Sequence, residues 1–296
     1  MPTNRRMFAV SGLLTGATVW GVVWYPFRLL DDMGVNGVAS TLMVFMVALS
    51  LGLVVYRQAL REINVGAVGL IWIALAAGWT NLAYVVAVIN GEVVRVMLLF
   101  YLAPLWTVFF ARYFLAERLN KTAMLVMALA LSGAVVMLWH PDLGKPWPKN
   151  SAEWFGISAG IAFALTNVLT RKAAQFSVQL KALAVWGGVV GVALIWALIE
   201  PPKWYMVAQL AWTGIGLIIL VGLVIWIATA AMQYGLTHTP ANQAIVILLF
   251  ELLVVAISSY YLADEMLSRQ EWIGGAMIVA ASLFSSFLEV EKSVNT

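Results

Sequence analysis

Apolar residues run along this chain in ten long stretches, and each stretch ends at charged residues or at proline and glycine. A helix crosses the hydrocarbon core of a bilayer, about 30 Å thick, with about 20 apolar residues. The pattern therefore predicts an all-α membrane protein with ten transmembrane helices. We expect them at residues 7–30, 35–56, 66–89, 92–115, 122–140, 152–171, 178–199, 208–235, 240–262 and 271–288.

Composition agrees with this pattern. Hydrophobic residues make up 63% of the 296 residues and charged residues 10%, against roughly 45–50% and 25% in a soluble domain. Little of the chain is left for a water-soluble domain. The chain has no cysteine, which excludes a disulfide framework and a thiolate metal site. The apolar run at 7–30 is longer than the core of about 7–15 residues in a signal peptide, so we expect it to be the first span.

The distribution of basic residues predicts the orientation in the membrane. With the N-terminus in the cytoplasm, 11 of the 17 Lys and Arg residues fall on the cytoplasmic side. Cytoplasmic segments of membrane proteins carry an excess of these residues. We therefore expect a multi-pass protein with both termini in the cytoplasm.

Two halves of the chain resemble each other. Residues 102–119 align with residues 251–267, so that Glu117 falls on Glu265 at an offset of 148 residues. We expect a first repeat at 1–140, an external Pro-rich linker at 141–151 and a second repeat at 152–296. Five spans per repeat is an odd number, so the second repeat enters the membrane from the opposite side. Two inverted five-helix repeats are a recurrent plan of secondary transporters.

These segments carry a family resemblance. Residues 81–138 and 248–284 resemble the drug/metabolite transporter superfamily, specifically its ten-helix members with two EamA-type repeats, in a helix with proline, a following Leu-x-Glu and a last span with glycine. Leu252 stands where the family has a proline, which Pro104 retains in the first half. The aromatic-rich spans look most like the bacterial exporters of aromatic amino acids. This resemblance implies a transporter in the bacterial inner (plasma) membrane that exports small organic solutes and needs no cofactor.

Candidate solute-binding residues are the polar and aromatic side chains that share helix faces within the spans. Spacings of three and four residues place such side chains on one face of a helix. Polar groups at membrane depth tend to face the bundle or a water-filled cavity, although they also join helices by hydrogen bonds, and aromatic residues also pack in the core or face lipid. The candidates are Trp20, Trp24, Asn81, Tyr84, Tyr101, Phe163, Asn167, Trp226, Thr229, Gln233 and Glu251.

Glu251 is the most informative of them, because apolar residues surround it near the middle of the ninth expected span. A charged side chain at that depth is costly unless it is paired, and the expected spans place no Lys or Arg at the same depth. Two hypotheses follow. Glu251 either couples transport to protons or binds an amine of the solute, or it is a protonated and hydrogen-bonded structural residue.

Other functions find less support. An intramembrane enzyme needs a nucleophile with a base, paired aspartates or a zinc motif, and the spans contain none of these. A channel is favoured by charged rings or a filter-like segment, which are also missing. Nothing in the composition indicates nucleic-acid binding. We expect alternating access around a central cavity, with the lipid bilayer and a small-molecule solute, such as an amino acid, as partners. Drugs or other metabolites are the alternative cargo, and a monomer is compatible with this plan.

Overall fold

The computed structural model describes residues 3–63, 68–90, 93–117, 121–138, 148–262 and 268–293, and every regular element in these residues is a helix. The elements are α1 (Thr3–Asp32), α2 (Gly37–Val55), the 3-10 helix η1 (Ala59–Glu62), α3 (Val68–Asn90), α4 (Val93–Phe100), α5 (Ala103–Leu115), α6 (Lys121–Leu138), α7 (Ser151–Lys172), α8 (Val178–Ile199), α9 (Trp204–Ala208), α10 (Trp212–His238), α11 (Ala241–Leu248), α12 (Phe250–Leu262) and α13 (Arg269–Ser293).

Most of the expected spans coincide with one helix, and their ends differ by a few residues. Two do not. The expected span at 92–115 consists of α4 and α5, and the expected span at 240–262 consists of α11 and α12. Pro104 lies in the first turn of α5, where a missing backbone N–H costs no helical hydrogen bond. Proline therefore suits the break that precedes it.

The second break occurs without proline. Tyr101 follows α4 and Leu249 follows α11, so the two breaks are 249 − 101 = 148 residues apart, which is the offset of the sequence repeat. Leu252, the residue that replaces the family's proline, lies in the first turn of α12. The proline is thus not needed for the chain to leave the helix at this point.

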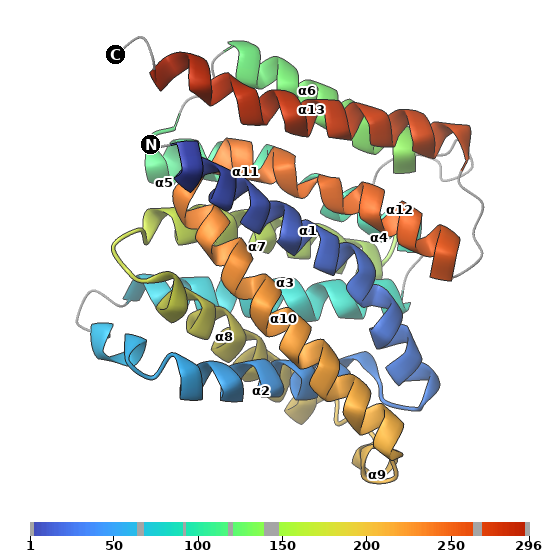
Figure 1. Cartoon of the computed structure of the whole chain (residues 1–296). Helices are drawn as coiled ribbons and strands as arrows, with labels where there is room; N and C mark the ends of the chain where they lie inside the picture. The colour runs from blue at the N-terminus through green and yellow to red at the C-terminus, as the bar shows by residue number, and fades with distance from the viewer. Residues whose placement is uncertain are drawn as a thin grey trace.

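The helices pack in layers (Figure 1). Helix α3 lies along α7 and α8, α1 lies along α10 and α12, and α2 contacts α8 and α10. The pair α6 and α13 lies on one side of these helices, at the top of Figure 1. Close approach of this pair requires glycine, because a Cβ on Gly133 would lie 2.8 Å from the carbonyl oxygen of Gly274. Small residues at helix interfaces are typical of membrane bundles.

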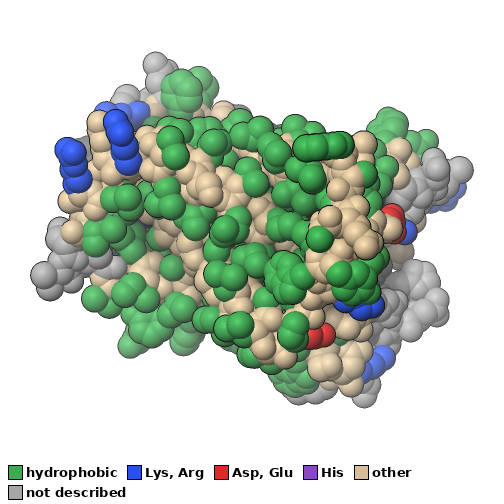
Figure 2. Space-filling model, turned by 90° about the horizontal axis from the view of Figure 1, so that it is seen from below, with side chains coloured by type: hydrophobic (Ala, Val, Ile, Leu, Met, Phe, Trp, Pro, Cys, Tyr) green, Lys and Arg blue, Asp and Glu red, His purple; other side chains and the backbone are tan. Residues whose placement is uncertain are grey.

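Among the described residues, seven helical segments are long and apolar enough to cross a membrane by length and composition. They are Arg5–Asp32, Gly37–Val55, Val68–Val88, Ser151–Lys172, Val178–Ile199, Trp212–His238 and Ala241–Leu262. Figure 2 shows one face of the bundle as a broad hydrophobic surface, with Lys and Arg side chains towards both ends and Asp and Glu side chains towards one of them. Large apolar side chains such as Leu198 (83% exposed) lie at the surface of the protein. The fold is that of a helical membrane protein.

Helix α1 begins and α13 ends at the same end of the bundle, on the left of Figure 1. Residues 139–147, which include most of the expected linker at 141–151, lie outside the described residues, and so does Glu265.

Asn150 caps α7, because its side chain accepts a hydrogen bond from the backbone N–H of Glu153 at 2.9 Å.

Glu117, the glutamate of the first Leu-x-Glu motif, binds the start of another helix. Its carboxylate accepts a hydrogen bond from the backbone N–H of Ala241 at 3.2 Å, at the first residue of α11. A carboxylate at a helix N-terminus is stabilised by the helix dipole. This contact joins the end of α5 to the start of α11, which belong to different halves of the sequence.

Candidate functional site

A cavity of about 90 Å³ lies in the middle of the bundle, between α1, α3, α4, α7, α8, α10 and α12. That volume exceeds the room that one buried water needs. Its lining residues are Trp20, Ala77, Thr80, Asn81, Tyr84, Phe100, Phe163, Thr166, Asn167, Val185, Thr229, Met232, Gln233, Leu236 and Glu251. Eight of the eleven residues proposed from the sequence are among them, so residues far apart in the chain meet at one place.

Two amide side chains at the cavity are buried without hydrogen-bond partners. Asn167 on α7 is 1% exposed, and neither its Oδ1 nor its Nδ2 has a partner. Gln233 on α10 is 3% exposed, and its Oε1 has none. A buried polar group without a partner costs about 1–3 kcal/mol. These unpaired atoms could form hydrogen bonds with a polar group in the cavity.

Thr80, Asn81 and Thr166, three further polar residues of the cavity wall, bond within their own helices. The Nδ2 of Asn81 donates to the carbonyl oxygen of Ala77 at 2.9 Å, and the hydroxyl of Thr166 donates to the carbonyl oxygen of Ala162 at 2.8 Å. Such bonds satisfy the donor and leave an oxygen atom that can still accept. Asn81 and Thr166 thus add acceptors to the cavity wall.

Aromatic rings form one wall of the cavity. The ring of Phe100 packs edge-on against Tyr84 with a centroid distance of 5.3 Å, and it lies 5.4 Å from the ring of Phe163. These three residues come from α4, α3 and α7. Separations of 4.5–7 Å are those of favourable aromatic pairs. The wall could hold a ring of a solute by the same contacts.

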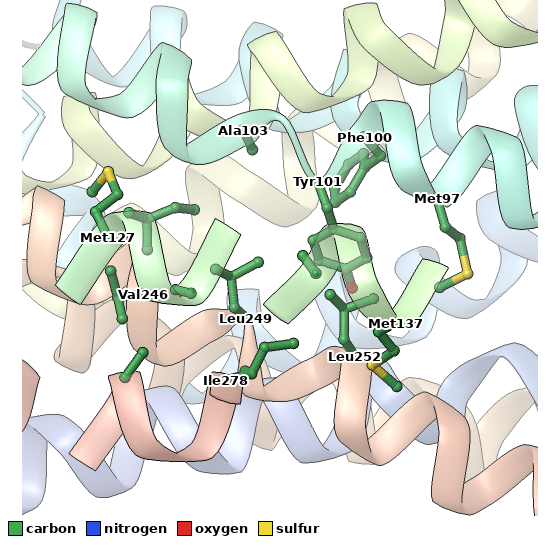
Figure 3. Packing of buried hydrophobic residues seen from close by; sticks show 14 of the residues in the cluster. Met97, Phe100, Tyr101, Ala103, Met127, Met137, Val246, Leu249, Leu252 and Ile278 are labelled. Atoms are coloured by element: carbon green, nitrogen blue, oxygen red, sulfur yellow. The ribbon is translucent and has the colours of Figure 1, made fainter. Parts of the chain in front are cut away.

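Glu251 is the one carboxylate among the described residues that line this cavity. It is the second residue of α12, directly after the break at Leu249. The free backbone N–H groups of a helix start favour negative charge at this place. The hydroxyl of Tyr101 donates a hydrogen bond to the Glu251 side chain. Figure 3 shows Tyr101 pointing from the break after α4 towards the helix that carries Leu252.

Three of the residues proposed from the sequence do not line the cavity. Tyr101 is buried, and its hydroxyl donates a hydrogen bond to Glu251, which does line the cavity. The indole N–H of Trp24 donates to the hydroxyl of Ser258 at 2.9 Å, which joins α1 to α12. Trp226 stacks on Tyr56 at 5.6 Å. Helical spacing in the sequence indicates which residues share one face of a helix. It does not indicate which residues of that face border the cavity.

Several cavity residues were missed by the sequence reasoning. Phe100 precedes Tyr101, Thr166 lies three residues after Phe163, and Met232 lies three residues after Thr229. The spacings of Thr166 and Met232 are helical, so the stripe on each helix could have predicted them. Ala77, Val185 and Leu236 are ordinary apolar residues and carry no such signal. Among the described residues, no three His, Cys, Asp or Glu side chains are grouped to hold a metal ion.

Comparison with known proteins gives matches to transporters. The model of the EamA-like transporter family matches residues 7–139 and 150–287. An uncharacterized transporter of Archaeoglobus fulgidus is 26% identical over 83% of this chain and 87% of its own length. An uncharacterized transporter of Pseudomonas aeruginosa is 25% identical over 66% of this chain and 64% of its own length. A crystal structure of a protein with 16% identity has the same fold, with a TM-score of 0.75 over 97% of this chain and 99% of that chain.

Proposed function

Because this chain belongs to the EamA-like transporter family, we propose that it exports aromatic or other apolar amino acids by alternating access through the cavity around Glu251. Family membership itself establishes a transporter of small-molecule solutes in a lipid bilayer. The choice of amino acids rests on the chemistry of the cavity.

One observation carries this choice. The cavity combines a wall of aromatic rings, a carboxylate and two buried amides that lack partners. An aromatic ring of the solute would pack against Tyr84, Phe100 and Phe163. The ammonium group of the solute would pair with Glu251, and its carboxylate would accept hydrogen bonds from the amide of Asn167. An apolar amino acid offers these groups within one small molecule.

The proposed mechanism needs two inverted five-helix repeats, at residues 1–140 and 152–296, joined by the linker 141–151. The contacts between helices support it. Contact of α3 with α7 has its counterpart in the contact of α10 with α1, and contact of α5 with α7 has its counterpart in that of α12 with α1. Such paired contacts are expected when two related halves are packed in opposite orientations. Rocking of one half against the other would open the cavity to each side in turn.

The proposed location is the bacterial inner membrane with both termini in the cytoplasm. The excess of Lys and Arg in the segments on that side supports it. The start of α1 and the end of α13 at one end of the bundle support it as well.

A second candidate is the export of drugs or other metabolites. The mostly apolar lining favours it, because Ala77, Val185 and Leu236 would accept apolar solutes without an ammonium group. The two functions differ in their dependence on Glu251, since only a solute with an amine gains from pairing with it.

Transport by the purified protein in proteoliposomes tests the proposal. Release of labelled phenylalanine, tryptophan, leucine, lysine and glutamate is measured with and without a pH gradient, and empty liposomes give the background. We expect phenylalanine, tryptophan and leucine to be released faster than lysine and glutamate. If the first three leave no faster than from empty liposomes, the choice of cargo is wrong, although the family and fold are unaffected.

A further inference from the structure

A fully buried lysine lies outside the cavity and has no role in the proposed function. Lys181 on α8 is 0% exposed. Its ammonium group donates hydrogen bonds to the hydroxyl of Thr237 on α10 and, at 3.5 Å, to the carbonyl oxygen of Thr170 on α7. The guanidinium group of Arg171 donates to the carbonyl oxygen of the same Thr237. Two cationic side chains thus meet where three helices come together.

No carboxylate among the described residues pairs with either cation. Two described carboxylates lie on neighbouring elements and bind backbone N–H groups: Glu62 of η1 accepts from Ser177 at 2.8 Å, and Glu117 at the end of α5 accepts from Ala241 at 3.2 Å. Desolvated charges are costly unless an opposite charge or further hydrogen bonds compensate them. An ammonium group has three donors, and that of Lys181 makes two hydrogen bonds within the described part of the chain.

Thr170 adds an independent sign of an incomplete site. Its side chain is 0% exposed, and its hydroxyl oxygen has no hydrogen-bond partner. Buried hydroxyl groups in native structures are nearly always paired. An anion between Lys181, Arg171 and Thr170 would accept hydrogen bonds from all three side chains.

The three helices that hold this cluster also line the central cavity. Thr170 lies four residues after Thr166, Thr237 lies four residues after Gln233, and Lys181 lies four residues before Val185. Four residues correspond to about one helical turn, roughly 5.4 Å along the axis. Helices α7 and α10 end at the end of the bundle where α8 begins. Thr170, Thr237 and Lys181 therefore all lie on the same side of the cavity-lining residues, towards this end. The cluster therefore lies about one helical turn from the cavity, towards that end of the bundle.

We propose that Lys181, Arg171 and Thr170 form a second binding subsite, specific for the carboxylate group of the solute, between the central cavity and this end of the bundle. This proposal rests on the proposed function, because it takes the cavity to be the transport pathway. It narrows the cargo to solutes with a carboxylate. The guanidinium and ammonium groups supply the charge, and the hydroxyl of Thr170 supplies an additional donor.

Ligand-dependent stability of the purified full-length protein in detergent tests this subsite without any transport. The probes are phenylacetate and phenylacetamide, which share the ring and differ in charge. We expect phenylacetate to raise the unfolding temperature of the wild type at concentrations at which phenylacetamide raises it less than half as much. A ligand that binds only the folded state stabilises it in this way.

Variants assign the effect to the cluster. We expect Lys181→Met to abolish the additional shift by phenylacetate, Thr170→Val to reduce it at least twofold, and Lys181→Arg to retain part of it. Lys121→Met, which removes an exposed lysine at the start of α6, is the matched control and leaves the shift unchanged. Thr170→Val decides the test if Lys181→Met does not fold, because the hydroxyl of Thr170 has no partner to lose.

Three outcomes would overturn the proposal. Equal shifts with phenylacetate and phenylacetamide would show no carboxylate preference. An unchanged shift in both Thr170→Val and Lys181→Met would place the carboxylate elsewhere. Equal stabilisation by chloride or inorganic phosphate at the same ionic strength would indicate a site for small ions and not for the solute. If the wild type does not transport phenylalanine, the proposed function is wrong. The subsite is tested separately, because the shift in unfolding temperature does not depend on transport.

Discussion

The hydroxyl group of Tyr101 donates a hydrogen bond to the side chain of Glu251, and each residue lies beside a break in its helix. Tyr101 follows α4 in the first half of the chain, and Glu251 is the second residue of α12 in the second half. Irregular backbone at membrane depth is tolerated where it is buried in protein or lines a cavity. Half-helices with ends at a central cavity are a recurrent way to build a transport site. The bond joins the two breaks at such a cavity.

Substitution of Glu251 by Gln tests the role of the carboxylate. The amide has the same shape and still accepts a hydrogen bond from Tyr101, so we expect the fold to be retained. An ion-paired hydrogen bond contributes about 1.5–3 kcal/mol, so transport of phenylalanine should fall by about tenfold to a hundredfold. Initial rates in proteoliposomes between pH 5.5 and 8.5 measure this effect, and the dependence on pH should flatten as well.

Glu200→Gln is the control for that variant, because Glu200 lies exposed at the end of α8 and accepts a hydrogen bond from Trp196. It should transport like the wild type. Unchanged rates and an unchanged pH profile in Glu251→Gln would rule out both coupling and amine binding by this carboxylate.

Substitution of Tyr101 by Phe separates positioning from binding. The ring contact with Phe100, at a centroid distance of 5.3 Å, is retained, while the hydrogen bond to Glu251 is lost. We expect the KM for phenylalanine to rise about threefold to tenfold, which corresponds to the roughly 0.5–1.5 kcal/mol of a hydrogen bond. Tyr113→Phe on the exposed side of α5 serves as the control. A KM equal to that of the wild type would show that Tyr101 does not position the carboxylate.

Asn167→Leu is expected to separate stability from function. Both polar atoms of Asn167 are buried without partners, so an apolar side chain of similar size removes a cost of about 1–3 kcal/mol. The unfolding temperature in detergent should stay the same or rise, while transport falls at least tenfold. Asn90→Leu at the exposed end of α3 should leave transport unchanged. A large loss of stability in Asn167→Leu would mean that the amide holds the fold together.

Gly160→Ala probes the contact between α7 and α4. A Cβ at this position would overlap the carbonyl oxygen of Phe100, so the two helices must move apart. Overpacking of this kind costs about 1–3 kcal/mol, which should lower the unfolding temperature and displace the aromatic wall. Gly216→Ala on α10, where no atom lies within 4 Å of the added Cβ, is the control. Equal unfolding temperatures for the two variants would contradict the close packing.

The sequence predicted most of the helices because long apolar stretches with short polar breaks leave few alternatives in a bilayer. It also predicted that Asn81, Asn167, Thr229 and Gln233 face a common interior, since polar groups avoid lipid. The break at Leu249 was not predictable, because no proline or glycine marks it.

Side-chain environments were predicted less well than helix faces. Lys181 contributes to the cytoplasmic excess of basic residues, and that count treats every lysine near a span end alike. Its complete burial depends on contacts with Thr237 and Thr170 on two other helices. Trp24 likewise lies away from the cavity because it bonds to Ser258, 234 residues further along the chain. A pattern within one helix contains no information on such partners.

Counterflow in proteoliposomes tests the central claim most directly. Vesicles are loaded with unlabelled phenylalanine and diluted into a trace of labelled phenylalanine, and the label inside is followed over time. A carrier that exposes its site to each side in turn accumulates the label transiently above equilibrium. We expect this overshoot for the wild type and a much smaller one for Glu251→Gln. A monotonic approach to equilibrium in the wild type, or no entry above that into empty liposomes, would contradict alternating access to phenylalanine through this cavity.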